Sequence, residues 1–273
     1  MRDVVRWLIR RSLSVLGASG QRSIAVLEEV GYLFSLFAES LYWAVAGRWL
    51  QQPVRLAPIF SAAMAVGVTA IPIIALASFA VGTMLAIQGI YSLRTFGAES
   101  QVALAIAISV TREFAPLITG IFVAGRSASA IAAQIGTMQV AQEIDALSVI
   151  GINPVRYLVS PLLLAMLIAM PALVVMSNFV ALSGGALYCN LELGMPFSAY
   201  VESTIDALKP SDVWQGLSKS FVFGAIITLV GASNGFMVTA GAEGVGKATT
   251  RSVVVSIASI ILADMIFSYF QSR

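Results

Sequence analysis

Long stretches without a charged residue constrain this chain more than any other feature. The first lies between Arg55 and Arg94 and holds 38 consecutive uncharged residues. A helix needs only about 20 apolar residues to cross the hydrocarbon core of a bilayer. Charged residues make up 11% of the 273-residue chain, whereas a soluble domain carries about 25%. The pattern therefore predicts an all-α integral membrane protein.

The apolar runs predict five membrane-spanning helices that are separated by polar connections. The expected spans cover residues 56–94, 99–136, 157–191, 220–242 and 252–273. Pro72 is expected to bend the first span, and a turn around Phe96 leads into the second. Residues 192–219 are interpreted as a mixed polar connection and residues 243–251 as a short loop.

The first 55 residues are predicted to form a separate N-terminal region before the membrane-spanning domain, residues 56–273. Over residues 1–20, arginines and apolar residues fall on two faces of a helix, which predicts a basic amphipathic helix on an anionic membrane surface. A frayed basic tail also fits. Residues 24–50 show apolar residues at helical spacing, interrupted by charges and interface-loving tryptophans. This favours a helix lying in the membrane interface over a further span.

The composition excludes several classes of function. The chain contains no histidine and one cysteine, Cys189, so histidine-dependent catalysis, histidine–zinc sites and an internal disulfide are excluded. A net charge of +2 offers no basic face for nucleic acid. The segment GAEGVGKAT, residues 241–249, resembles a phosphate-binding loop, but Ala248 stands where a hydroxyl would bind magnesium. We interpret its glycines as a tight loop, in which Lys247 and Arg251 would meet lipid phosphates or a partner.

The distribution of lysine and arginine predicts the orientation in the membrane. With the N-terminus inside, the inner segments carry ten of these residues and the outer segments carry four. Positive residues concentrate on the cytoplasmic side. Five spans then place the C-terminus outside and residues 138–153 inside.

Charged residues inside the second span are the main candidates for a site. Arg112 and Glu113 lie about 13 residues, or roughly 20 Å, from the outer turn, and neighbours on a helix point about 100° apart. Charges at this depth are expensive unless they are paired or face a polar cavity. One interpretation is a cavity for an amphiphile with a charged head. The other is a structural pairing with Asp264, in which Arg126 would be a further member of the charged set.

The same span carries a stripe of small residues. Gly120, Ala124, Ala128, Ala132 and Gly136 recur every fourth position. Such a stripe allows helices to approach closely in a membrane. We therefore interpret it as a packing surface.

The segment MQVAQEIDALSVIGINP, residues 138–154, predicts a short amphipathic helix between two spans. Ala146, Val149 and Ile150 form one apolar face, whereas Gln142, Glu143 and Asp145 form the exposed polar face. Gly151 and the Asn153–Pro154 pair end the helix. A helix of this kind could receive force from an ATPase, although an ordinary connecting loop also fits.

The block TREFAPLITGIFVAGRSASAIAAQIGTMQVAQEIDALSVIGINPVRYLVSP, together with GVGKATTRSVVVS, resembles the MlaE (YrbE) permease family. The resemblance runs from about residue 24 to the C-terminus and leaves the first 20 residues unmatched. It implies a homodimeric ABC transporter core in the bacterial inner membrane that moves phospholipid between the inner and outer membranes. The implied partners are an MlaF-like ATPase, an MlaB-like STAS protein and a hexameric MlaD-like MCE protein. No cofactor is expected on this chain, since ATP and magnesium would bind the ATPase.

The resemblance also assigns roles to residues. Arg112 and Glu113 match the charged pair of the family's lipid cavity, and Phe96 stands where a relative has tyrosine. The expected cavity set is completed by Phe114, Leu85 and Leu93. Residues 138–153 match the coupling helix, and the expected ATPase contacts are Gln142, Glu143, Asp145, Ala146, Leu147 and Gly151.

Three alternatives to a phospholipid permease remain open from the sequence. An intramembrane enzyme acting on lipids would have to use Arg112, Glu113 and Asp264. A scaffold would only anchor partners and would tolerate loss of these charges. A permease with an MCE partner could also carry sterols or other hydrophobic molecules, and neither the direction of transport nor the lipid headgroup follows from the residues.

Overall fold

The computed structural model describes residues 24, 27–47, 56–239 and 241–271, and these are helical apart from short turns. Five helices of this part of the chain are long and apolar enough to cross a membrane. They cover Leu56–Arg94, Glu99–Val140, Val155–Leu193, Pro210–Phe236 and Gly241–Gln271. The predicted fold class and the predicted number of spans are therefore confirmed.

The N-terminal region is described only in part. Residues 27–46 form a helix, as predicted for the segment 24–50. Its position in a membrane interface stays a prediction. The amphipathic helix expected over residues 1–20 and the region boundary expected at residue 55 lie outside the described residues.

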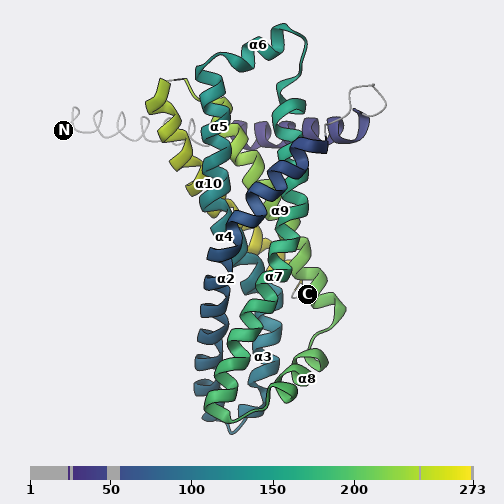
Figure 1. Cartoon of the computed structure of the whole chain (residues 1–273), viewed down its shortest axis with the longest axis vertical. Coiled ribbons are helices and arrows are strands. Elements are labelled where there is room, and N and C mark those ends of the chain that lie inside the picture. The colour runs from purple at the N-terminus through teal and green to yellow at the C-terminus, as the bar shows by residue number, and fades with distance from the viewer. Residues whose placement is uncertain (1–23, 25–26, 48–55, 240, 272–273) are drawn as a thin grey trace, which may run out of the picture.

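The first two spans are joined by a tight turn. Helix α2 (Leu56–Arg94) contains Pro72, and Figure 1 shows the helix changing direction near its middle, as expected for a proline without an N–H donor. The second span starts with a short 3-10 turn (Glu99–Gln101) and then runs through α3 (Val102–Ser109), α4 (Ala115–Val123) and α5 (Ser129–Val140). Two π-helical turns, η2 (Val110–Phe114) and η3 (Ala124–Ala128), separate these helices.

Helix α6 (Glu143–Val149) follows α5 and lies at one end of the molecule (Figure 1). The third span combines the π-helical turn η4 (Val155–Val159) with α7 (Ser160–Leu193). The short helix α8 (Phe197–Ala207) lies at the opposite end. Its Tyr200 is buried against the bundle, and burial raises the pKa of the phenol well above its usual value, so it packs as a neutral side chain.

The fourth span, α9 (Pro210–Phe236), begins ten residues earlier than the sequence predicted. The expectation that residues 192–219 form a polar connection was therefore wrong for their last part. Pro210 is favourable at the first position of a helix, and Asp212 accepts a hydrogen bond from the Lys209 backbone N–H at 3.0 Å. Asp212 lies in the first turn of this helix, and Lys219 and Ser220 further along it are also buried in the bundle.

The last span also begins earlier than predicted. Helix α10 covers Gly241–Gln271, so the glycine-rich segment interpreted as a tight loop is helical. Gly241 makes the turn with a φ of +50°. Glu243 and Lys247, four residues apart, form an ion pair along the helix, and Arg251 pairs with Glu29 at 2.8 Å. Both basic side chains thus have carboxylate partners within this chain.

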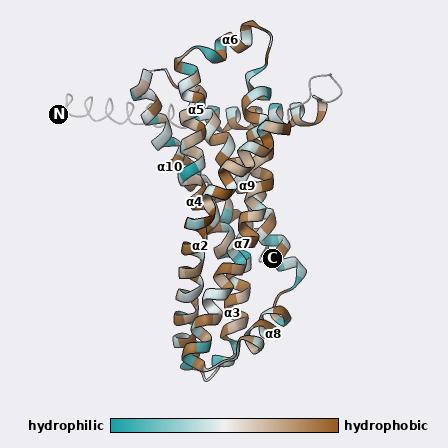
Figure 2. Cartoon of the chain, in the orientation of Figure 1, coloured by the Kyte–Doolittle hydropathy of each residue, from teal (hydrophilic) through white to brown (hydrophobic). Residues whose placement is uncertain are grey.

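Helix α9 packs against α5, α7 and α10, whereas α2 packs mainly against α7. The core forms three clusters along the long axis. The cluster nearest α6 contains Ile135, Ile144 and Val159, the middle one contains Ile74 and Phe223, and the one nearest α8 includes Tyr200. Figure 2 shows mostly apolar ribbon along the spans, with hydrophilic residues concentrated towards the two ends. Little of α2 and α10 is buried within one chain, which leaves two long apolar surfaces.

The small-residue stripe lies in this core, as predicted. Gly120, Ala124, Ala128, Ala132 and Gly136 are all buried. An added Cβ at Gly120 would lie 3.0 Å from Phe223 of α9. The stripe is therefore a packing surface, confirming the interpretation from the sequence.

Candidate functional site

Arg112 and Glu113 lie on the π-helical turn η2, in the middle of the second span. A π-helical turn inserts an extra residue into a helix and is frequent at functional sites. The side chains are 40% and 38% exposed, respectively, although the flanking residues Val110 and Ala115 are buried. The turn therefore presents two opposite charges side by side at the edge of an apolar core.

Arg112 forms an ion pair with Asp212, near the start of α9. The Arg112 Nε and Nη2 atoms donate to Asp212 Oδ1 at 3.0 and 2.6 Å. The Asp212 side chain is 1% exposed, and its second oxygen accepts the Lys209 backbone N–H. The Asp212 carboxylate thus caps α9 and orients the Arg112 guanidinium, which remains partly exposed.

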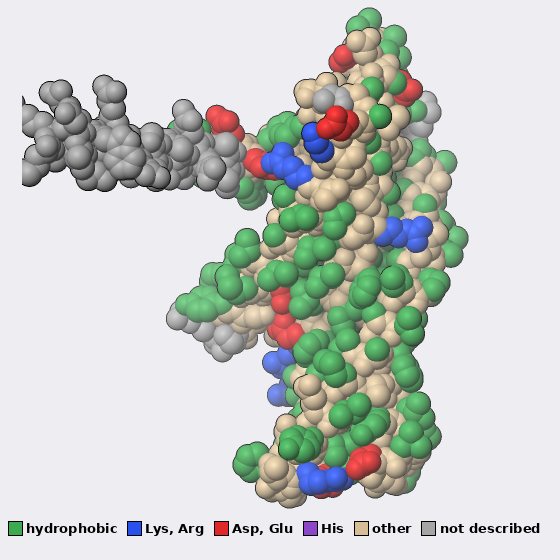
Figure 3. Space-filling model, turned by 90° about the vertical axis from the view of Figure 1, so that its left-hand side faces the viewer, with side chains coloured by type: hydrophobic (Ala, Val, Ile, Leu, Met, Phe, Trp, Pro, Cys, Tyr) green, Lys and Arg blue, Asp and Glu red, His purple; other side chains and the backbone are tan. Residues whose placement is uncertain are grey.

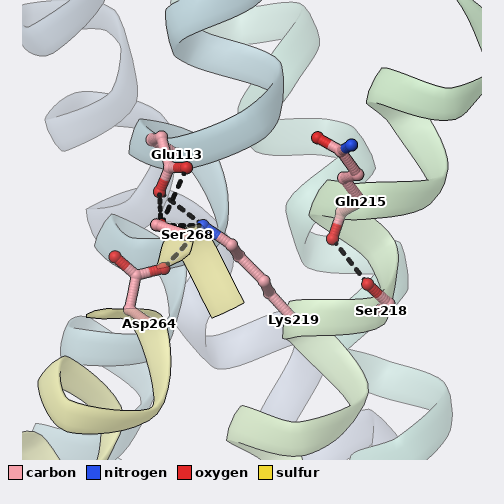
Figure 4. A network of polar contacts seen from close by, with 6 residues as sticks. All are labelled: Glu113, Gln215, Ser218, Lys219, Asp264 and Ser268. Atoms are coloured by element: carbon pink, nitrogen blue, oxygen red, sulfur yellow. Dashed lines mark hydrogen bonds and ion pairs between the residues drawn. The ribbon is translucent and has the colours of Figure 1, made fainter. Parts of the chain in front are cut away.

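Glu113 is held by Lys219, one of the largest fully buried side chains. Figure 4 shows the Lys219 side chain reaching from α9 towards Glu113, Asp264 and Ser268. Its Nζ atom forms an ion pair with Glu113, lies 2.9 Å from Asp264 Oδ1 and donates to Ser268 Oγ at 3.1 Å. Ser268 in turn donates to both carboxylate oxygens of Glu113, at 3.0 and 3.2 Å. Helices α9 and α10 are thereby tied to the turn η2.

The network brings two cations together with three carboxylates. The cations are Arg112 and Lys219, and the carboxylates are Asp212, Glu113 and Asp264. With all five groups ionised, the network carries one net negative charge. An uncompensated charge is costly in an apolar environment, so the site favours one further positive charge, supplied by a proton or by a bound cationic group.

The close approach of α9 to η2 depends on a glycine. A Cβ added at Gly216 would collide with the backbone carbonyl oxygen of Thr111. Gly216 lies between Asp212 and Lys219 on the buried side of α9. This contact sets the distance at which both ion pairs can form.

The structure corrects the pairing expected from the sequence. Asp264 does not pair with Arg112, because α10 places it beside Lys219. Arg126 is also separate from Asp264 and donates through Nη1 to the backbone oxygen of Thr69 at 2.6 Å. These pairings depend on which helices are neighbours in the fold, and the sequence pattern does not show this.

Asp212 and Lys219 were missed because they fell in a segment interpreted as a connection. A signal for them exists in the sequence. Asp212, Gly216, Lys219 and Phe223 recur at helical spacing, and all four are buried on one side of α9. Following this spacing towards the N-terminus from the apolar run would have extended the predicted fourth span and placed Asp212 and Lys219 inside it.

The remaining residues of the expected cavity are spread along the molecule. Phe114 is half-buried on the same turn as Arg112. Leu85 and Leu93 pack against the cluster nearest α8, and Phe96 is 83% exposed in the turn after α2. Within one chain, the structure thus joins Phe114 to the charged pair and places the other three nearer the α8 end.

The expected ATPase-contacting residues lie together on and around α6. Gln142 precedes the helix with a φ of +58°, and Gly151 follows it with a φ of +80°. Glu143, Asp145 and Ala146 are exposed, whereas Leu147 is half-buried. The expected apolar face is open, with Val149 86% and Ile150 69% exposed, and Ile144 anchors the helix to the core.

Five apolar helices, with a charged network that joins the second span to α9 and α10, define a multi-pass helical membrane protein with an intramembrane polar site. Figure 3 shows a mostly apolar flank, on which charged side chains lie at the two ends and in separate small patches between them.

Comparisons with known proteins identify the family. Residues 59–270 match the family model described as Permease MlaE, and the chain belongs to this permease family. A probable ABC transporter permease protein of Rickettsia felis is 36% identical over 256 residues, which cover 94% of this chain and 97% of that protein. The chloroplastic protein TRIGALACTOSYLDIACYLGLYCEROL 1 of Arabidopsis thaliana is 38% identical over 195 residues, which cover 71% of this chain and 56% of that protein.

Membership of this family makes the chain the non-catalytic membrane component of an ABC transporter. Hydrolysis of ATP takes place in a separate ATPase subunit. The hypothesis of an intramembrane enzyme is therefore set aside.

Proposed function

We propose that this chain is the permease subunit of a phospholipid transporter in the bacterial inner membrane. Two copies would form the transport pathway, powered by the separate ATPase. An MCE protein would carry the lipid between the inner and outer membranes, and a STAS protein would join the ATPase. The name of the Arabidopsis relative contains a galactolipid, trigalactosyldiacylglycerol, which supports a lipid with a polar head as the substrate class.

The half-exposed pair of Arg112 and Glu113 carries the proposal. A guanidinium offers several N–H donors in a plane and binds phosphate oxygens well. Asp212 occupies only part of the Arg112 guanidinium, so donors remain for a lipid phosphate. Glu113, whose network has an excess of negative charge, would suit an ammonium group in the same headgroup.

The two ends of the molecule offer separate docking surfaces. The open apolar face of α6 and its acidic residues would contact the ATPase, whereas the α8 end would face the MCE protein. The exposed apolar surfaces of α2 and α10 would meet lipid and a second copy of the chain.

The test is ATP-driven transfer of a labelled phospholipid in vesicles that contain this chain with its ATPase. We expect Arg112→Gln to reduce transfer about tenfold or more, because it removes a charge-assisted hydrogen bond worth about 1.5–3 kcal/mol. Glu113→Gln should also reduce transfer while the amount of protein in the membrane is retained. The matched control is Arg251→Gln, which removes an exposed ion pair with Glu29 outside the site.

Different outcomes separate the competing functions. Unchanged phospholipid transfer in both site variants would remove the charged pair from the transport site. Transfer of a labelled sterol in place of phospholipid would favour the alternative substrate. A scaffold would support no transfer of either lipid, and its assembly with partners would survive both substitutions.

A further inference from the structure

A cavity lies towards the α6 end of the molecule. Its volume is about 940 Å³, at the upper end of the range of about 300–1,000 Å³ found for small-molecule pockets. Its walls come from the start of α2, from η3 with the first half of α5, and from residues 151–162. None of the charged network around Arg112 and Glu113 is among the described lining residues. Arg126 lies 14 residues beyond Arg112, or about 21 Å along a helix.

The chemistry of the cavity is cationic and apolar. Arg126 and Arg156 both line it, together with Gln134 and Tyr157, and no aspartate or glutamate is among the described lining residues. Most of the other lining side chains are apolar: Pro58, Ala62, Ala65, Val66, Ala130, Ile131, Ile152, Leu158, Pro161 and Leu162. Two guanidinium groups beside an apolar wall match an amphiphile with an anionic head.

Arg126 differs from several other basic side chains in the spans in its lack of a carboxylate partner among the described residues. Arg112, Lys219 and Arg251 each pair with a carboxylate. Within the described residues, no carboxylate forms an ion pair with Arg126, and its Nη1 atom donates a hydrogen bond to the Thr69 backbone oxygen. A guanidinium has five N–H donors, and the Arg126 side chain lines the cavity. A charge inside a membrane span without a counter-ion is expensive, and a bound anion would offset that expense.

We propose that this cavity binds the phosphate headgroup of a phospholipid from the leaflet on the α6 side, at a site separate from Arg112 and Glu113. Arg126 and Arg156 would hold the phosphate, and the acyl chains would lie along Val66, Ile131 and Leu162. The apolar wall distinguishes a lipid from free phosphate, and the two arginines distinguish it from a sterol. The identity of the ligand rests on the proposed function in lipid transport.

Photo-crosslinking tests the site in the full chain. p-Benzoylphenylalanine would replace Tyr157, which lines the cavity and is 44% exposed. The matched control position is Phe60, which is 65% exposed on α2 beside the cavity but absent from its lining. The protein would be placed in phosphatidylcholine vesicles that contain a fluorescent phosphatidylglycerol. We expect lipid labelling at both positions.

We expect Arg126→Gln to lower labelling at position 157 about tenfold, which is the loss expected for one charge-assisted hydrogen bond. Labelling at position 60 should stay unchanged. Lys247→Gln, outside the cavity, should change neither. If Arg126→Gln does not reach the membrane, Arg156→Gln provides the same test.

Several results would overturn the proposal. Equal labelling at position 157 with and without the arginines would make the contact ordinary bilayer contact. A crosslink to a second copy of the chain would show that the cavity is a subunit interface. Competition by inorganic phosphate as strong as by phosphatidylglycerol would assign a free anion. If position 157 is never labelled while the unmodified chain still transports lipid, this second site fails and the proposed function stands.

Discussion

Lys219 illustrates how a single buried side chain joins three helices of this permease. Its ammonium group lies between Glu113 of the second span and Asp264 of α10, and Ser268 completes its hydrogen bonds. The Lys219 side chain is fully buried, so solvent screens its interactions only weakly. Its charge is therefore what allows two carboxylates to approach each other inside the membrane.

Replacing Lys219 should be strongly destabilising. Lys219→Met keeps much of the side-chain volume but leaves Glu113 and Asp264 facing each other without a cation. Removing one partner of a buried ion pair typically costs about 3–5 kcal/mol. We expect a clear drop in the temperature at which the purified chain loses its monodisperse peak on heating, and partial recovery when Asp264→Asn is added.

The matched control for this substitution is Lys247→Met. Lys247 is 77% exposed in its pair with Glu243, and exposed pairs contribute little. A Lys219→Met protein that is as heat-stable as this control would contradict the role assigned to Lys219.

At the level of elements, the site depends on how closely α9 packs against the turn η2. The contact point is Gly216, where any added Cβ would meet the Thr111 backbone oxygen. Backbone atoms cannot move aside as a flexible side chain can. The glycine therefore sets the separation of two helices that together supply Arg112, Glu113, Asp212 and Lys219.

Gly216→Ala should consequently damage both stability and transport. We expect α9 to move away from η2, which lengthens the two ion pairs and lowers both the thermal stability of the purified chain and its lipid transfer. The control is Gly67→Ala in α2, where an added Cβ meets nothing within 4 Å and alanine is favoured over glycine in a helix by about 0.5–1 kcal/mol. Equal behaviour of the two variants would refute the proposed packing role.

Helix α6 is the element expected to contact the ATPase. Glu143→Lys reverses an exposed charge, and Val149→Asp places a charge in the open apolar face. Both should reduce the amount of ATPase that co-purifies with the chain, while leaving its own heat stability unchanged. Asp206→Lys, exposed on α8 at the opposite end, is the control. Undiminished recovery of the ATPase with both α6 variants would show that α6 is not the contact.

The whole molecule is elongated, with α6 and α8 at opposite ends (Figure 1). Helix α2 alone has 39 residues, or about 58 Å at 1.5 Å per residue, which exceeds the hydrocarbon thickness of about 30 Å. The spans must therefore extend beyond the bilayer or tilt. At the α8 end, Arg94 bridges Glu99 and Glu192 at 2.9 and 3.2 Å, which ties three segments together where they leave the apolar region.

This shape and the distribution of positive residues make the topology testable. In a Cys189→Ser background, single cysteines would replace the exposed Ser148 on α6 and Ser198 on α8. We expect a membrane-impermeant thiol reagent to label Ser198→Cys in intact spheroplasts, and Ser148→Cys only after the membrane is opened. The reverse labelling pattern would invert the topology and would move the ATPase contact away from α6.

The sequence alone determined the class of protein, the number of spans, the bend at Pro72, the packing stripe through Gly120 and Gly136, and the helix at α6. These properties depend on local periodicity and on the sum of hydropathy along a segment, both of which can be read residue by residue. The start of α9 was predicted too late, because buried polar side chains such as Lys219 lower the apparent hydropathy of a helix that they stabilise.

Only the tertiary structure decided which charges meet. It paired Arg112 with Asp212, placed Lys219 between Glu113 and Asp264, and left Arg126 beside a cavity and a backbone oxygen. Lys219 and Ser268 are 49 positions apart, and Glu113 and Ser268 are 155 positions apart. No local pattern encodes which helices become neighbours. The close approach at Gly216 also arises from that packing, so the geometry of the site is a property of the folded bundle.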